Sequence, residues 1–150
     1  MATTLRLNNK IPGMSLTRQQ IQLIKNSWKS LRGIRPELIA DIFYSKLFTD
    51  NPRLRKMFPA DMKQQYMKLM DMLNTIVLRL DKPGQMDDEI KAMAARHAGY
   101  GVKTTHYKQV GDALLWTLKQ GLGDSWNTEV ESAWIACYDV LATAMSNRSQ

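Results

Sequence analysis

The sequence lacks several residue types and patterns, and each shortage excludes a class of protein. A single cysteine, Cys137, occurs in 150 residues, so no intramolecular disulfide can form and a secreted, disulfide-stabilised fold is excluded. No apolar run approaches the roughly 20 residues that a membrane-spanning helix needs. The N-terminus also lacks the apolar stretch of a secretory signal. We therefore expect a cytoplasmic protein without a membrane span.

Glycine and proline are scarce as well, with eight and five residues. This scarcity favours long, uninterrupted helices. The hydrophobic share of 44% and the charged share of 23% are typical of a globular chain, and the length suits one domain. We expect residues 1–15 to form a flexible tail and residues 16–150 to form a single domain.

Runs of like charge are missing too, although the formal net charge is +7. Such an excess of basic residues raises the possibility of nucleic acid or an anionic membrane as a partner. The basic residues are scattered, however, and no motif for reading bases is present. We expect a solvated basic surface and no nucleic-acid partner, while an acidic redox partner remains open.

Apolar residues recur at steps of three and four along most of the chain, which predicts helices. Thr17 can cap the first helix, Gly33 ends it, and Pro36 suits the first turn of the second. Further helices are predicted at 62–80, 86–99, around 107–118, and from about 128. No strand pattern or repeat is found. The sequence therefore predicts an irregular all-α domain of about six helices.

Histidine is nearly absent, with only His97 and His106. A zinc site built from histidine and cysteine would need three or four ligands, and together with Cys137 the chain offers three such side chains in total. Cys137 lies in an apolar helical stripe and is interpreted as an inert core thiol. His97 lies near the end of a predicted helix, on the same face as Met93. It can be a hydrogen-bonded core histidine or an imidazole that faces a metal in an apolar slot.

The predicted helix 62–80 carries two lines of residues. Its main apolar stripe, which includes Tyr66, is expected to face the core. A neighbouring line of Gln65, Leu69 and Met72 would bring one polar side chain into an apolar cavity. Tyr44, inside the apolar face of an earlier helix, could add a second donor, as binding pockets often combine apolar walls with a few donors. Gln65 on the surface and Tyr44 as an ordinary core aromatic remain open.

Taken together, these residues resemble the globin family, in particular bacterial single-domain globins and the globin domain of flavohaemoglobins. The resemblance covers roughly residues 17–148. The matching stretches are Phe43-Tyr44-Ser45-Lys46-Leu47-Phe48 with Asn51-Pro52, Phe58, Gln65 and Leu69, Arg96-His97, Tyr107 inside His-Tyr-Lys-Gln-Val-Gly, and Ala133-Trp134 with Tyr138. It implies a globin-like fold of about six to eight helices that enclose a pocket for haem b (iron protoporphyrin IX).

The resemblance also implies a role for each matching residue. His97 would be the proximal iron ligand. Tyr44 and Gln65 would be the distal donors, with Leu69 as the apolar wall. The residues that would contact the haem are Phe58, Met72, Met93, Arg96, Val102 and Tyr107. Donors aimed at dioxygen, which becomes partly negative when bound, would slow its release. His106 is badly placed to reach the opposite haem face, so a second histidine ligand is not expected.

The function implied by the resemblance is reversible binding of O2, NO or CO. A nitric oxide dioxygenase that draws electrons from a separate reductase is one alternative, and a haem-based gas sensor is another. Flavohaemoglobins continue into a reductase, whereas this chain ends at Gln150, and Ser149 occupies the position of a glutamate in those proteins. Both departures favour a gas-binding protein, which we expect to be a monomer or weak homodimer.

Overall fold

The structure of the protein, a computed structural model, describes residues 16–99 and 104–149. Every element in this part is a helix, which confirms the predicted all-α class. The elements are α2 (Arg18–Arg32), α3 (Pro36–Asp50), the 3₁₀-helix η1 (Pro52–Met57), α4 (Lys63–Arg79), α5 (Pro83–Gly99), α6 (Thr104–Leu122), the 3₁₀-helix η2 (Gly123–Ser125) and α7 (Thr128–Ser149). The predicted tail, residues 1–15, lies outside the described residues.

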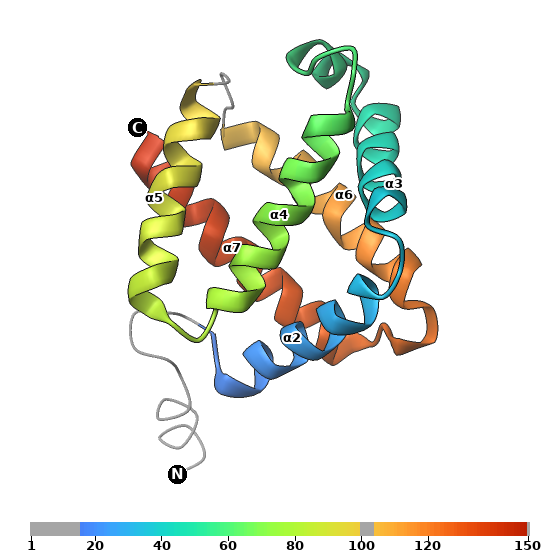
Figure 1. Cartoon of the computed structure of the whole chain (residues 1–150). Helices are drawn as coiled ribbons and strands as arrows, with labels where there is room; N and C mark the ends of the chain where they lie inside the picture. The colour runs from blue at the N-terminus through green and yellow to red at the C-terminus, as the bar shows by residue number, and fades with distance from the viewer. Residues whose placement is uncertain (1–15, 100–103, 150) are drawn as a thin grey trace.

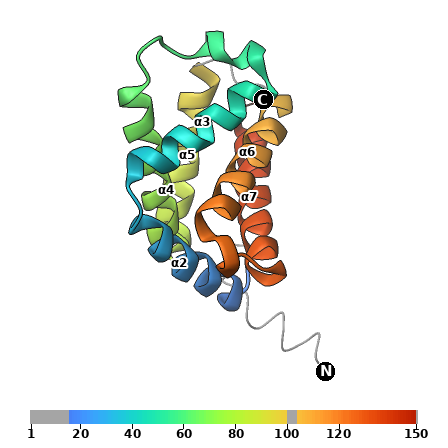
Figure 2. The same cartoon turned by 90° about the vertical axis from the view of Figure 1, so that its right-hand side faces the viewer.

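The helices form two layers that cross one another. α6 and α7 lie together on one side of the molecule, and α4 and α5 lie on the other (Figure 1 and Figure 2). α3 packs mainly against α6 and also contacts α4, while α2 contacts α7, α6 and α4. This arrangement leaves α4 with α5 on one flank and α3 on the other (Figure 1).

Local sequence signals account for most helix ends. Thr17 and Gln20 form a reciprocal capping box at the start of α2, with hydrogen bonds of 3.0 and 2.9 Å. Pro36 occupies the first turn of α3, as predicted. α5 begins at Pro83, earlier than the predicted residue 86. Proline lacks only an N–H that the first turn does not use, so Pro83 starts this helix and does not merely separate it from α4.

Buried polar contacts connect helices α2, α4 and α7. Trp28 Nε1 donates to Asn74 Oδ1 at 2.7 Å, and Trp134 Nε1 donates to Ser27 Oγ at 2.9 Å. The two tryptophan rings meet edge to face at 6.3 Å. These bonds satisfy both indole donors inside the core, so they fix the angle between the helices at little desolvation cost.

Within the two described ranges, residues 16–99 and 104–149, no helix is both long and apolar enough to cross a membrane.

Candidate functional site

The two predicted polar side chains, Tyr44 and Gln65, meet at the contact between α3 and α4. Gln65 Nε2 donates a hydrogen bond to the Tyr44 hydroxyl oxygen at 3.1 Å, and only 4% of Tyr44 is exposed. Because the hydroxyl accepts this bond, its own proton is available for another acceptor. Among the described residues, Tyr44 donates to none. The pair therefore presents an unused O–H group in a buried position.

The Tyr44 ring lies at the centre of an aromatic cluster. Its centroid is 4.9 Å from Phe43, 5.8 Å from Phe48 and 5.6 Å from both Phe58 and Tyr66. Phe58 lies directly after η1, so the 3₁₀-helix carries this ring into the cluster. Such aromatic pairs add stability beyond the area that they bury. The cluster therefore holds the Tyr44 hydroxyl in a defined position.

Arg55 fixes the corner between η1 and α4. Its guanidinium donates to the backbone carbonyls of Phe58 at 3.2 Å, Pro59 at 2.9 Å and Ala60 at 3.1 Å. It also lies 5.4 Å from the centre of the Phe48 ring. No sequence signal marks Arg55 for this role, because only the folded corner brings the three carbonyls to one side chain.

Burial sets the protonation state of the site. Desolvation raises the pKa of Tyr44 to about 12, although the Gln65 bond lowers it and Tyr66 adds a smaller increase. Burial likewise raises the pKa of the Cys137 thiol to about 12. Tyr44 is therefore a hydrogen-bond donor at neutral pH, and Cys137 is the protonated, buried core thiol that the sequence predicted.

A hollow at the surface includes Gln65 in its lining. This cavity of about 260 Å³ is lined by Pro59, Asp61, Gln64, Gln65 and Lys68. Gln65 is itself half-buried. Gln65 thus both contacts the buried Tyr44 hydroxyl and lines a depression that opens to solvent.

The predicted iron ligand, His97, lies in the last turn of α5, as expected from the sequence. Its side chain is outside the described part. Met93, one helical turn earlier, is only 1% exposed, and Ile90 and Ala94 are also buried. Residues four apart share a helix face, so position 97 continues the face of Met93. α5 therefore presents an apolar face that ends at a histidine.

Arg96 is anchored away from the apolar face of α5. Its guanidinium pairs with Glu89 at 3.4 Å, and Glu89 also accepts from Arg79 on α4 at 3.2 Å. The Arg96 side chain is 50% exposed. The two arginines thus share one carboxylate that connects α4 to α5, and contact of Arg96 with a cofactor stays a prediction.

The remaining predicted pocket residues lie on three segments. Leu69 is buried and Met72 half-buried on α4. Tyr107 is buried near the start of α6, and its carbonyl accepts from the Tyr138 hydroxyl. Val102 is outside the described residues. Contact of these residues with a cofactor likewise stays a prediction.

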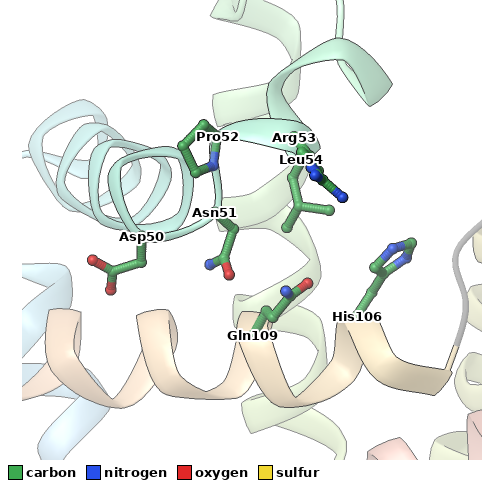
Figure 3. Close-up of a pocket in the computed structure, with 7 residues that line it drawn as sticks. All are labelled: Asp50, Asn51, Pro52, Arg53, Leu54, His106 and Gln109. Atoms are coloured by element: carbon green, nitrogen blue, oxygen red, sulfur yellow. The ribbon is translucent and has the colours of Figure 1, made fainter.

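His106 lies at a second cavity, which shares no lining residue with the hollow at Gln65. This cavity of about 360 Å³ lies between the end of α3, η1 and α6. Figure 3 shows His106 and Gln109 rising from α6 towards Arg53 and Leu54. No cluster of three or more metal-ligating His, Cys, Asp or Glu occurs within the described ranges.

Two curated relatives align with most of the chain. A flavohemoprotein of Vibrio cholerae is 28% identical over 136 residues, which cover 89% of this chain and 34% of the relative. The chain thus spans about a third of that protein's length. The anaerobic nitrite reductase AHB2 of Arabidopsis thaliana is 29% identical over 147 residues, which cover 88% of this chain and 92% of the relative.

Solved structures are similar throughout. An engineered carbene transferase from Rhodothermus marinus, described as a putative nitric oxide dioxygenase, matches with a TM-score of 0.78 and 29% identity over 90% of this chain and 94% of its own. A bacterial globin from Campylobacter jejuni gives a TM-score of 0.76 and 25% identity over 89% of this chain and 96% of its own. A sequence model of the globin family matches residues 41–145, well over half of the chain. The resemblance predicted from the sequence is confirmed, and the chain belongs to the globin family.

Proposed function

We propose that this protein binds haem b and reversibly binds dioxygen and other small diatomic gases. The observation that carries the proposal is the buried pair of Tyr44 and Gln65, in which the amide donates to the hydroxyl and the tyrosine O–H has no acceptor among the described residues. A donor held at this position, inside an aromatic cluster, suits a small acceptor in an otherwise apolar space.

The described residues fit a haem group. α4 offers the buried Leu69 and the half-buried Met72, and α5 offers the buried Met93 on the face that ends at His97. The haem iron supplies a position where a gas molecule binds reversibly. His97 would hold the iron from one side. Globin relatives whose names include haem, such as the Vibrio cholerae flavohemoprotein and leghemoglobin 49 of Vicia faba, support haem binding.

Tyr44 and Gln65 would then decide which gas is retained. The Tyr44 O–H would donate to a gas that gains negative charge on binding, as dioxygen does. Gln65 would hold the tyrosine oxygen in place and offer its second amide proton. A hydrogen bond to a charged acceptor contributes about 1.5–3 kcal/mol. Carbon monoxide gains less charge and would benefit less from the same donors.

A nitric oxide dioxygenase is the second candidate function. The similarity to the Rhodothermus marinus protein, which is described as such an enzyme, favours it. This activity needs a supply of electrons. The electrons would come from a reductase, which we propose as a partner of this globin domain.

Haem binding is tested by adding haemin to the purified protein and recording the Soret band. We expect a haem complex with the spectrum of an imidazole ligand, and we expect His97→Ala to lose that spectrum. His106→Ala is the matched control, since the other histidine lines a separate cavity, and should retain it. A colourless protein that takes up no haemin would contradict the proposal. An unchanged spectrum in His97→Ala would contradict the ligand assignment.

The two functions are separated by mixing the oxygen-loaded protein with nitric oxide and supplying a flavin-dependent reductase. Repeated turnover to nitrate would support the dioxygenase. A single conversion without recovery of the oxygen-loaded form would support gas binding alone.

A further inference from the structure

Tyr66 couples the aromatic cluster to the protein surface. Its ring lies parallel to Tyr44, with an interplanar angle of 4° and a centroid distance of 5.6 Å. Its hydroxyl donates to Oδ1 of Asp41 at 2.8 Å. Tyr66 is half-buried and Asp41 is exposed. One phenol thus joins the buried Tyr44 ring to a surface carboxylate.

We propose that Tyr66 is a redox-active tyrosine that passes single electrons from small surface donors to the haem pocket, with Asp41 as its proton acceptor. The proposal rests on the proposed haem function. It would add a peroxidase activity toward phenols or ascorbate-type reductants, with hydrogen peroxide as the oxidant.

The geometry suits the chemistry of phenol oxidation. A phenol that loses an electron becomes a strong acid, so oxidation is far easier when a base takes the hydroxyl proton in the same step. The Asp41 carboxylate is within hydrogen-bond distance for this transfer. Tyr138 provides a contrast, because its hydroxyl donates to the backbone carbonyl of Tyr107, which is not a useful base.

The charged groups around Tyr66 keep its proton in place before oxidation. Desolvation, followed by the hydrogen bond and the charge of Asp41, raises the pKa of Tyr66, while Arg55 lowers it by a smaller amount. Tyr66 is therefore a neutral phenol at neutral pH, and its proton must leave together with the electron.

The electron balance closes with two donors for each peroxide. A bound haem would supply the site at which hydrogen peroxide takes up two electrons and two protons and yields two waters. For each electron, Tyr66 sends one electron through the stacked Tyr44 ring and its O–H proton to Asp41, which leaves a neutral tyrosyl radical. A surface phenol then gives a hydrogen atom to the radical and becomes a phenoxyl radical, and Asp41 returns its proton to solvent.

The test is electron paramagnetic resonance of the haem-loaded protein, frozen after one equivalent of hydrogen peroxide. We expect a tyrosyl radical that Tyr66→Phe abolishes. Asp41→Asn keeps an Oδ1 that can accept the hydrogen bond but is not basic, so the radical should fall several-fold. Trp116→Phe is the control for an exposed aromatic outside the cluster, on α6, and should leave the signal unchanged.

Two further measurements distinguish failure of the Tyr66 relay from failure of haem binding. The rate of ascorbate oxidation should fall several-fold in Tyr66→Phe and Asp41→Asn, whereas oxygen dissociation should not change, because Tyr44 and Gln65 are retained. A radical that persists in Tyr66→Phe, or at full amplitude in Asp41→Asn, would overturn the relay and leave the haem function intact. Absence of a Soret band would overturn both proposals.

Discussion

Replacing Tyr44 by phenylalanine removes only the hydroxyl oxygen and its proton. The ring is packed on Phe43, Phe48, Phe58 and Tyr66, and a phenylalanine ring can keep all four contacts. The hydroxyl accepts one hydrogen bond, from Gln65 at 3.1 Å, and carries the free proton. The effect of the substitution is therefore confined to the proposed gas donor and its partner amide.

The expected magnitude follows from the lost hydrogen bond. A bond from a neutral donor to a partly charged acceptor contributes about 1.5–3 kcal/mol, and each 1.4 kcal/mol changes an equilibrium about tenfold. Removal of the Tyr44 hydroxyl also frees the Gln65 amide, which can then turn towards the gas and recover part of the loss. We therefore expect the oxygen dissociation rate to rise about tenfold, the lower end of the range.

Stopped-flow displacement of oxygen by carbon monoxide measures this rate, with carbon monoxide dissociation as the internal control. Gln65→Leu and the double variant complete a double-mutant cycle, and the two single effects should not add because the side chains touch. An oxygen rate that does not change in Tyr44→Phe would refute the reasoning. Equal increases for oxygen and carbon monoxide would refute it as well, because they would point to loss of packing.

Three other changes test the frame around the site. Arg55→Met removes donors to three backbone carbonyls and should cost about 1–2 kcal/mol of unfolding free energy in urea titrations, with faster amide exchange at Phe58. In Gly121→Ala the new methyl group would overlap the buried Leu31 side chain, so a loss of about 1–2 kcal/mol is expected despite the gain in helix propensity. The pKa of Cys137 rises from 9.0 to about 12 on folding, so above pH 9 the unfolded chain binds fewer protons than the folded chain and stability falls. The free energy of unfolding should drop by about 1 kcal/mol between pH 9 and about pH 10, and Cys137→Ala should remove this part of the slope.

Helix class and most helix ends were predictable because their causes are local. Thr17 and Gln20 are three residues apart, and their capping box forms within one turn. The start of α5 was predicted too late, because the apolar spacing becomes visible only at Met86 while Pro83 already occupies the first turn. Which helices pack against one another could not be predicted from such local signals. It depends on contacts such as Trp134 to Ser27, which join opposite ends of the chain.

The contact between Tyr44 and Gln65 was predictable for a different reason. Tyr44 and Gln65 are polar residues on apolar helical faces, and such residues need partners when they are buried. The roles of Arg55 and Tyr66 had no comparable signal. Arg55 resembles any exposed basic residue, and Tyr66 shares the apolar stripe of α4. Only the crossing of α3 and α4 brings Asp41 to the Tyr66 hydroxyl, across 25 positions of sequence.

Because position 65 is a glutamine, we expect gas release to be independent of pH in the neutral range. A glutamine amide does not titrate, and burial raises the pKa of its partner Tyr44 to about 12. Both proposed gas donors therefore keep their protons throughout the neutral range, and neither would gain or lose charge when a gas binds. The oxygen dissociation rate should stay constant between about pH 6 and about pH 10, where a distal histidine would titrate near its lower end. A step in the rate inside this window that persists in Tyr44→Phe would place the titrating group elsewhere. A step that disappears in that variant would show that the tyrosine ionises, contrary to its burial.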